Sequence, residues 1–531
     1  MKPNNMSISK LIVVIFICSN AFQGCSSEVN PYLDKDINLC VTIADREVKI
    51  DSTELVEAIN KTRNVLSDLS GLGVVVFDKS NILFEHYTGK TGLDSPRFVN
   101  SETAFYIAST TKSLMASCIL TLVESGDLGL DVPIVNYLPK LHFNSWLLNE
   151  NKISIRDLLT HNSGINSRAL EIRTSITGQY SDKILLELYA DASGSFFKPA
   201  YSNLNYILLG LIIQEVTGKS WRHNLQHRLF DPLKMTRTFT KWPKPGTNNV
   251  ALPLTMDQNK NLIHLPDQNP LQTNTLFPSG GVIASARDLS NYIQLFLNCG
   301  SLFDQRILNE ETITQAISID AQKESGGLHD YQGFGLGWEI AFHDSLKLAL
   351  HNGSNKVGSR SYMGFSPELE LGIIILSNEN IVSPYVHGAI ARYVLDAARN
   401  QIIASKNLET NLTRWKTKAE KRYNNRMEGR QYPVFDLPEQ HLPDKPLSNL
   451  IGTYKSEEYG TLKVSISEGM LKLIIGNMNS SRTHRITAES FLADFGIESE
   501  QVNFTIKNNV ATEVEFQNMG MVFKKVSSTL N

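Results

Sequence analysis

The sequence contains few cysteines for a chain of 531 residues. Two of the five lie near the N-terminus, one in an apolar run and one in a candidate lipid-attachment motif, and the other three cannot form a complete disulfide framework. We therefore expect a hydrophobic core to stabilise the fold, because 41% of the residues are hydrophobic and the length suggests more than one domain. The cysteines are Cys18, Cys25, Cys40, Cys118 and Cys299.

Several well-known catalytic and cofactor patterns are missing. No Gly-x-Ser-x-Gly turn and no His-Glu-x-x-His helix occurs, so neither an α/β-hydrolase nor a zinc peptidase has support. The glycines at 333, 335 and 337 lack the preceding strand and following helix that dinucleotide binding requires. Residues 218–220 (Gly-Lys-Ser) fail as a phosphate loop because Ile213 stands where the first glycine is needed. The residues therefore imply neither a metal nor a cofactor.

Neither sign of charge dominates the composition. The formal net charge is −3 at pH 7 and the isoelectric point is about 6.5, so nothing in the charge indicates nucleic-acid binding. We expect a small molecule or a short peptide as the substrate. The sequence leaves the oligomeric state open.

The apolar run near the N-terminus is too short for a membrane span. It covers residues 11–18 and follows two lysines, which is typical of a secretory signal. Residues 19–21 (Ser-Asn-Ala) fit cleavage by signal peptidase, whereas residues 22–25 (Phe-Gln-Gly-Cys) resemble a bacterial lipobox that would attach lipid to Cys25. We therefore expect an exported protein that is periplasmic, secreted or anchored to a bacterial membrane through Cys25.

Three short stretches supply the groups that an acyl-transfer site needs. They are residues 109–112 (Ser-Thr-Thr-Lys), 201–203 (Tyr-Ser-Asn) and 351–353 (His-Asn-Gly). A serine hydroxyl is a poor nucleophile at neutral pH, so an amine or a phenolate of lowered pKa must take its proton as it attacks a carbonyl. Residues three apart lie on one face of a helix, which predicts that the Lys112 amine lies beside the Ser109 hydroxyl.

The candidate nucleophile precedes an apolar helix. Residues 114–124 predict a buried helix in which Cys118 is a buried thiol. Ser109 would then lie at the helix N-terminus, where free N–H groups and the positive end of the dipole favour an oxyanion. By itself Ser-x-x-Lys is weak evidence, and the solvated start of a helix is its alternative. Context favours catalysis, because residues 201–203 lead into a second apolar helix and residues 351–353 begin a strand-turn-strand pattern.

With these motifs the chain resembles the penicillin-recognising serine hydrolases, in the branch that holds class C β-lactamases, D-stereospecific peptidases and β-lactamase-like esterases. The likeness spans residues 55–405, and further motifs follow in the order that is familiar in this family. They are residues 153–164, 210–218, 229–235, 278–289 and 333–338.

The resemblance implies a role for each site residue. Ser109 is similar to the acylated nucleophile, Lys112 to its activating partner, and Tyr201 to the second proton-transfer group, which also serves the leaving group. Asn203 is expected to orient the acyl side chain and to hold Lys112. Taken alone, Tyr201 has a plainer interpretation as a core tyrosine whose hydroxyl is satisfied locally. His161 is expected to hold loop structure rather than to take part in chemistry.

His351 stands where many relatives carry the lysine of a Lys-Thr-Gly element. It is expected to be a conditionally charged group that faces a substrate carboxylate or takes part in proton transfer. The alternative interpretation is that His351 caps the strand. Gly353 would permit close approach of the edge strand, and the backbone N–H groups of Ser354 and Ser109 would form the oxyanion hole. Asn352 replaces the usual hydroxyl residue, so recognition of a β-lactam or a terminal carboxylate does not follow from the motif.

The resemblance implies an α/β fold, with a β-lactamase/transpeptidase-like antiparallel sheet, flanking helices and a helical lobe. The residues themselves predict a helix over 55–66, a hairpin over 73–87 that turns at 79–81, and a helix over 384–405 that packs on the sheet. The active site is expected between the sheet and the lobe.

We divide the chain into a signal peptide (1–24), an N-terminal extension (25–54), a hydrolase domain (55–405), a linker (406–448) and a C-terminal domain (449–531). Prolines and a basic run broken by asparagine and glycine indicate the linker. The basic run is interpreted as a solvated face, with contact to anionic lipid as the alternative. In the C-terminal domain the periodicity changes to two, which predicts strands and resembles the small lipocalin-like β-barrel of some β-lactamase-like peptidases and esterases.

These observations predict an exported serine hydrolase that cleaves amide or ester bonds through an acyl-enzyme on Ser109. The leading subclass is a β-lactamase-like enzyme or a D-stereospecific carboxypeptidase or aminopeptidase, and the runner-up is a β-lactamase-like carboxylesterase. A non-catalytic binding or assembly scaffold is the alternative from another class. The intact set of Ser109, Lys112, Tyr201 and Asn203 argues against it, since a scaffold has no need of all four.

Overall fold

The structure is a computed structural model that describes most of the chain from residue 48 onwards. The described residues are 48–150, 152–178, 180–195, 199–243, 249–264, 277–323, 329–355, 358–430, 446–476, 478–495 and 499–526. The predicted signal peptide and Cys25 lie outside them. Within the described part, no helix combines the length and the apolar character that a membrane span requires.

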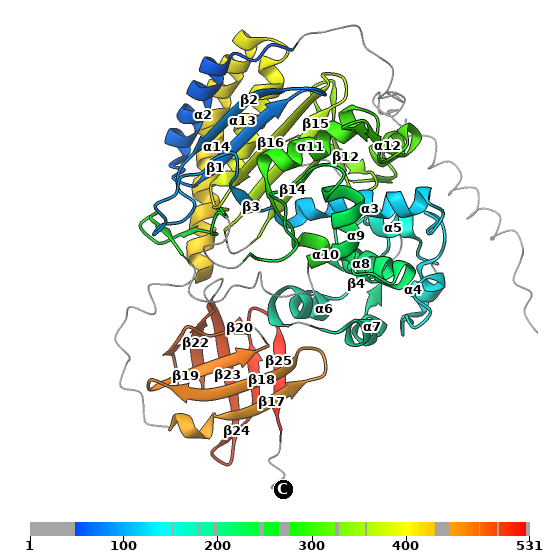
Figure 1. The fold of residues 1–531 in the computed structure, drawn as a ribbon. Coiled ribbons are helices and arrows are strands. Elements are labelled where there is room, and N and C mark those ends of the chain that lie inside the picture. Colours follow the sequence, from blue (N-terminus) through cyan, green and yellow to red (C-terminus); the bar gives the residue numbers. More distant parts are fainter. Residues whose placement is uncertain are drawn as a thin grey trace, which may run out of the picture. The chain divides into compact units, whose positions relative to one another are not determined.

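An eight-stranded antiparallel sheet forms the centre of the hydrolase domain (Figure 1), which confirms the predicted fold class. The strand order is β11-β12-β13-β14-β15-β16-β1-β2, so the N-terminal hairpin joins strands that come far later in the chain. The predicted turn of this hairpin is confirmed, because Asp78 accepts the N–H groups of Ser80 and Asn81 at 2.7 and 2.6 Å. The strands are β1 (Leu72–Phe77), β2 (Ile82–Thr88), β11 (Ala321–Gln322), β12 (Asp330–Phe334), β13 (Glu339–His343), β14 (Leu346–Ser354), β15 (Arg360–Ser366) and β16 (Leu371–Ser377).

The sheet carries a separate hydrophobic core on each face, because successive side chains of a strand point to opposite sides. In β1, Val74 and Val76 belong to the core under α2, α13 and α14, whereas Val75 and Phe77 belong to the core with α3 and α11. Figure 1 shows these helices on opposite faces of the sheet. Their bounds are α2 (Ser52–Leu66), α3 (Thr111–Glu124), α11 (Ala286–Leu297), α13 (Ser383–Ala397) and α14 (Gln401–Arg430).

The helix predicted over residues 384–405 is in fact two helices. Helix α13 ends at Ala397, and α14 begins after Asn400, whose Oδ1 accepts the N–H groups of Ile402 and Ile403 at 3.0 and 3.2 Å. Asparagine is a favoured N-cap because its side chain satisfies N–H groups that have no partner within the helix. A new helix therefore starts at this residue.

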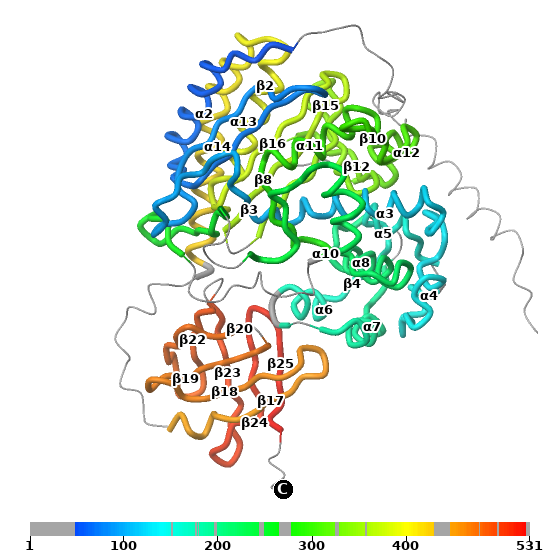
Figure 2. Tube along the Cα trace, in the orientation of Figure 1, coloured from blue at the N-terminus to red at the C-terminus, as the bar shows by residue number. Residues whose placement is uncertain are grey.

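Helix α14 also corrects the predicted linker, because residues 406–430 continue it through Asn424 and Asn425, where a break was expected. The physical reason is an apolar stripe at helical spacing within the basic run. This stripe packs onto α13 and α2, and Figure 2 shows the yellow trace of α14 beside the blue trace of α2. Its members are Ala404, Leu408, Leu412, Trp415, Ala419 and Tyr423, none more than 7% exposed.

A mostly helical lobe adjoins the sheet and contains the predicted nucleophile helix. In α3 every residue from 111 to 120 is buried, which confirms the buried helix and the buried free thiol of Cys118. Cys299, in contrast, takes part in a disulfide bond. The other helices of the lobe are α4 (Trp146–Glu150), α5 (Ile155–Leu159), α6 (Arg168–Ile172), α7 (Asp182–Ala190), α8 (Asn203–Thr217), α9 (Trp221–Leu225) and α10 (Phe277–Gly280).

The C-terminal domain is a nine-stranded antiparallel sheet with the order β20-β19-β18-β17-β25-β24-β23-β22-β21. Alternate residues such as Leu462, Val464 and Leu473 gather in a core of its own. The edge strands β20 and β21 do not pair within the described residues, so the sheet is a curled half-barrel where the sequence predicted a barrel. The strands are β17 (Gly452–Ser456), β18 (Gly460–Ser467), β19 (Met470–Ile475), β20 (Met478–Asn479), β21 (Arg482–Arg485), β22 (Ser490–Asp494), β23 (Ser499–Lys507), β24 (Val510–Phe516) and β25 (Met521–Lys525).

Candidate active site

Ser109 lies where a strand passes into a buried helix. Strand β3 (Ala104–Tyr106) pairs with β8 (Ile283–Ser285), and a short 3₁₀ turn, η1 (Ala108–Thr110), then leads directly into α3. Ala108 has a φ of 47°, the left-handed region that is costly for a residue with a Cβ. Such strain is typical of sites where the surroundings fix a backbone in place. The half-buried Ser109 is thus held at a defined position.

The Lys112 amine lies beside the Ser109 hydroxyl, as the helical spacing predicts. Lys112 is 0% exposed, and its Nζ lies 3.2 Å from Ser109 Oγ, 2.8 Å from Asn203 Oδ1 and 2.8 Å from the Ser279 carbonyl oxygen. Burial lowers the pKa of Lys112 well below its usual range, although the negative charge of Glu339 opposes this shift. An amine in this environment can be neutral at physiological pH and can accept the proton of the hydroxyl.

Tyr201 and Asn203 come from the start of α8, which brings them to the same place. The Ser202 hydroxyl caps this helix by accepting the N–H of Leu204 at 3.2 Å. The Tyr201 ring centroid lies 4.8 Å from Lys112 Nζ. The Tyr201 side chain is 41% exposed overall, yet desolvation of its hydroxyl end raises the pKa, while a hydrogen bond with Ser109 lowers it. The phenol therefore stays protonated at neutral pH.

His161 holds the loop that carries Tyr201, in agreement with the structural role predicted for it. Its Nδ1 accepts the Ser202 N–H at 3.1 Å and its carbonyl oxygen accepts the Ala200 N–H at 2.9 Å. Its ring packs on the Tyr201 ring with centroids 4.5 Å apart. Burial, reinforced by the charge of Lys112, lowers the pKa of His161 well below its usual range, so the ring is neutral.

The third stretch, residues 351–354, is the end of β14 and runs past its neighbour β13. The pairing with β13 extends only to Leu350, opposite Glu339, so no strand pairs with residues 351–354 on this side within the part of the chain that the structure describes. On the other side Ser354 pairs with Arg360 of β15. The structure thus presents an open strand edge near η1, which is the kind of edge that an extended peptide can join.

Gly353 lies against the turn that carries Ser109. A Cβ at this position would be 2.0 Å from the Ile107 carbonyl oxygen and 2.2 Å from Ser361 Oγ, so only glycine fits. The Ser361 hydroxyl donates to the same Ile107 oxygen at 2.7 Å and lies 2.7 Å from the Thr110 hydroxyl. These contacts fix the end of β14, and with it the Ser354 backbone, relative to Ser109.

His351 is buried, and this changes the role expected for it. It is 3% exposed, its Nδ1 lies 2.9 Å from the Asn352 carbonyl oxygen, and its ring centroid lies 6.3 Å from that of Tyr201. Burial, followed by the charge of Lys112, lowers the pKa of His351 to about 3. In the free protein His351 is therefore a neutral polar group at physiological pH rather than the conditionally charged one that we predicted.

Asn352 is fully engaged with neighbours that the sequence analysis did not single out. Its Nδ2 donates to the Tyr331 hydroxyl at 3.1 Å, and its Oδ1 accepts from Arg360 Nη2 at 2.9 Å. Glu339, which acts on the pKa of Lys112, is paired with Lys323 at 3.2 Å. No motif marks these residues. The pairing register of the sheet brings these residues to the site, and the sequence pattern of a single strand does not reveal that register.

Among the described residues, one group of side chains has ligand atoms close enough together to bind a metal ion. None of its members is a site residue that the sequence predicted. His343, Asp344 and Asp396 have ligand atoms within 4.8 Å of one another. Each of these residues already has a protein partner: His343 Nε2 lies 2.6 Å from Asp396, and Asp344 is paired with Arg399 at 2.9 Å. The group therefore needs no ion to explain it.

Comparison with known sequences identifies a family and distant relatives. The profile of the Beta-lactamase family matches residues 59–397. Protein flp of Staphylococcus aureus (strain COL) is 25% identical over 350 residues, which cover 63% of this chain and 64% of flp. The matched part therefore spans less than two thirds of that relative.

Comparison with solved structures shows the same fold. The octameric penicillin-binding protein homologue from Pyrococcus abyssi has a TM-score of 0.55 at 22% identity, over 90% of this chain and 100% of that one. D-amino acid amidase from Ochrobactrum anthropi SV3, complexed with D-phenylalanine, has a TM-score of 0.54 at 21% identity, over 65% of this chain and 99% of that one. At these identities the likeness concerns the fold.

Proposed function

Because the chain belongs to the beta-lactamase family, we propose that it cleaves amide or ester bonds through an acyl-enzyme on Ser109. The observation that supports this most strongly is the 3.2 Å contact between Lys112 Nζ and Ser109 Oγ. A buried amine of lowered pKa next to a serine hydroxyl is the arrangement that nucleophilic catalysis needs.

In the proposed reaction Ser109 Oγ attacks the substrate carbonyl while Lys112 accepts its proton. The backbone N–H groups of Ser109 and Ser354 stabilise the oxyanion of the tetrahedral intermediate. Tyr201, whose pKa burial raises, acts as the proton donor to the leaving group rather than as the base that activates Ser109. Water then hydrolyses the acyl-enzyme, and the same groups move the protons in reverse.

For the substrate we propose a short peptide with a D-residue at the cleaved bond. The open edge of β14 can pair with an extended main chain, since its residues beyond Leu350 have no strand partner on that side among those described. A structural neighbour of the same fold is named as a D-amino acid amidase, and this supports an amide substrate. β-Lactams are cyclic amides that the same groups would open, leaving the acyl group on Ser109.

An ester is the runner-up substrate, and Asn352 favours it. Asn352 stands where a hydroxyl residue is usual, and Tyr331 and Arg360 occupy both polar atoms of its amide. This position therefore offers neither a hydroxyl nor a free amide group to hold a terminal carboxylate. A substrate without a terminal carboxylate, such as a simple ester, needs no such contact.

A labelling experiment tests the proposed function. Purified protein and the Ser109→Ala variant are treated with a fluorophosphonate and with a fluorescent penicillin. Labelling of the native protein alone supports the enzyme, whereas no labelling of either protein by any probe supports the scaffold alternative. Rates on p-nitrophenyl butyrate and on D-alanyl peptides, compared with the same peptides of L-configuration, then separate esterase from D-peptidase.

We also propose that the protein is exported and that lipid on Cys25 anchors it to a membrane. The disulfide at Cys299 supports export, because disulfides persist in oxidising compartments. Fractionation of the producing cells tests export. Incorporation of labelled palmitate into the native protein but not into a Cys25→Ala variant tests the anchor, and equal incorporation into both would contradict it.

A further inference from the structure

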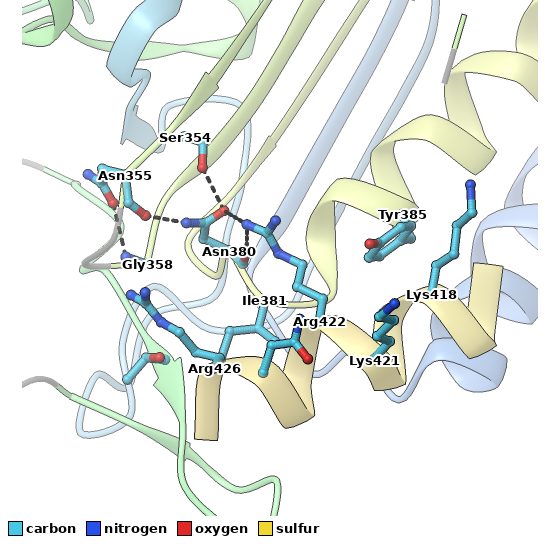
Figure 3. A pocket seen from close by; sticks show the side chains of 12 residues that line it. Ser354, Asn355, Gly358, Asn380, Ile381, Tyr385, Lys418, Lys421, Arg422 and Arg426 are labelled. Atoms are coloured by element: carbon cyan, nitrogen blue, oxygen red, sulfur yellow. Dashed lines mark hydrogen bonds between the residues drawn. The ribbon is translucent and has the colours of Figure 1, made fainter. Parts of the chain in front are cut away.

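Ser354, at the end of β14, lines a basic cavity. The cavity has a volume of about 620 Å³ and is bounded by α14, by the end of β14 and by the segment after β16. Its lining includes four basic side chains and no acidic one. Figure 3 shows the basic side chains rising from α14 on one side and the amides of Asn355 and Asn380 on the other. The basic residues are Lys418, Lys421, Arg422 and Arg426.

Hydrogen bonds connect the two walls of this cavity. Arg422 Nη2 donates to the Asn380 carbonyl oxygen at 3.2 Å, and the Ser354 hydroxyl donates to Asn380 Oδ1 at 2.8 Å. The Asn380 amide nitrogen donates in turn to the Asn355 carbonyl oxygen, and these bonds are drawn in Figure 3. The cavity is therefore a built feature that ties α14 to β14.

The charges of Lys418 and Lys421 have no partner among the described residues. Both side chains are exposed, and neither forms a hydrogen bond or ion pair with the residues that the structure describes. A basic run on a helix is ordinarily a solvated face. Here, however, the like charges line a concave surface, where low-dielectric walls focus the potential and raise the local concentration of anions.

The cavity and the active site share a wall. Ser354, which lines the cavity, follows Gly353, and Gly353 packs against the carbonyl of Ile107, two residues before Ser109. Helix α14 begins at residue 401, after the end of the family match at residue 397. The basic wall therefore lies outside the residues that the family profile matches.

We propose that this cavity binds an anionic group of the substrate, a carboxylate or a phosphate, while the scissile bond lies at Ser109. The proposal rests on the proposed hydrolase function and adds a determinant of specificity to it. Lysine and arginine side chains form charge-assisted hydrogen bonds with both anions. The amide groups of Asn355 and Asn380 hold the opposite wall in place.

The test removes the charges of Lys418 and Lys421 and compares matched substrates. The full-length double variant Lys418→Gln/Lys421→Gln is measured against Lys406→Gln/Arg414→Gln, which removes two exposed charges from the same helix outside the cavity. The substrates are phenyl butyrate, its 4-carboxy and 4-phosphate derivatives on the phenyl ring, and phenyl hydrogen glutarate, which carries a carboxylate on the acyl side. The measured quantity is kcat/KM for each anionic ester divided by that for phenyl butyrate.

We expect this ratio to fall about 5- to 10-fold in the cavity variant for at least one anionic ester, and less than twofold in the control. The ester that is affected identifies the anion and the side of the scissile bond on which it lies. An unchanged ratio, or an equal fall in the control variant, overturns the proposal. Loss of binding to phosphatidylglycerol vesicles with an unchanged ester ratio also overturns it, because the wall would then be a membrane contact.

Binding to protein with Ser109→Ala separates this proposal from the proposed function. Isothermal titration with the anionic esters is carried out on Ser109→Ala with and without the two glutamine substitutions, since neither protein can form the acyl-enzyme. If the native protein hydrolyses neither the esters nor the D-alanyl peptides but binding weakens 5- to 10-fold on substitution, the hydrolase function fails and the anion site stands. If hydrolysis proceeds and binding is unchanged on substitution, the function stands and the anion site fails.

Discussion

The backbone of Gly353 lies so close to Ile107 that an added Cβ would be 2.0 Å from the Ile107 carbonyl oxygen. This contact joins the end of β14 to the turn before Ser109. It therefore sets the distance between the two backbone N–H groups, of Ser109 and Ser354, that the proposed oxyanion hole uses. The geometry of the site depends on glycine at this one position.

Substitution Gly353→Ala should lower kcat/KM by about 100-fold, because a displacement of about 1 Å at a catalytic group costs that much. Gly280→Ala is the matched control, since a Cβ there would have its nearest neighbour at 3.7 Å, an ordinary contact. Ester hydrolysis and thermal unfolding are measured for both. Activity of Gly353→Ala equal to that of the control would contradict the role of this contact.

Removal of the His161 ring nitrogen should loosen the Tyr201 loop. In His161→Leu the buried Ser202 N–H loses its acceptor, which costs about 1–3 kcal/mol of stability, and acylation should slow. His161→Asn should retain most of the stability and most of the acylation rate, because asparagine tolerates the left-handed φ of 58° at this position and can accept the same N–H. Acylation as slow in His161→Asn as in His161→Leu would mean that the imidazole itself takes part in the reaction.

Motif order and periodicity predicted a large part of the fold and the proximity of Ser109, Lys112, Tyr201 and Asn203. The spacing of Ser109 and Lys112 predicted their contact because both lie within one helical turn. The buried helix α3 and the antiparallel hairpin of β1 and β2 were visible because each has an uninterrupted local pattern. In these cases the interaction that decides the structure lies between residues close in sequence.

The features that sequence analysis missed depend on long-range register. The Arg360 guanidinium that holds Asn352 comes from a segment with no local signature. The Ser279 carbonyl that holds Lys112 lies within the motif at 278–289, but the motif does not show that this carbonyl meets Lys112. Helix α14 was interpreted as a linker because its charges and asparagines obscured a stripe of apolar residues such as Trp415. The stripe packs against α13 and α2, and this packing stabilises the helix because most helical stability in proteins comes from the burial of an apolar face.

Substitution Trp415→Ala should destabilise the hydrolase domain by about 3–5 kcal/mol, because this side chain is 6% exposed in the core beneath α14. Arg414→Ala, at the neighbouring exposed position, should change stability by no more than about 0.5 kcal/mol. Urea unfolding followed by tryptophan fluorescence and circular dichroism provides the measurement. Equal stability of the two variants would show that α14 is not part of the domain core.

Acid should destabilise the fold through its buried histidines. Burial lowers the pKa of His329 to about 3, so between pH 6.5 and 3 the unfolded chain binds one more proton at this residue than the native one does. Stability contributed by neutral His329 is complete above pH 6.5 and falls by about 1.4 kcal/mol per pH unit below it. Urea unfolding at pH 7, 6 and 5 should therefore give a shallower pH dependence for His329→Gln than for the native protein. Parallel curves would show that His329 titrates normally in the fold.

The most direct test of the central claim is the rate at which Ser109 is acylated with and without the amine of Lys112. Protein is mixed with a p-nitrophenyl ester, quenched at intervals and digested, and the acylated peptide is quantified by mass spectrometry. The account predicts the acyl group on Ser109 and a rate about 10²- to 10⁴-fold lower in Lys112→Met, as expected for loss of a general base. An acyl group on another residue, or an unchanged rate in folded Lys112→Met, would contradict it.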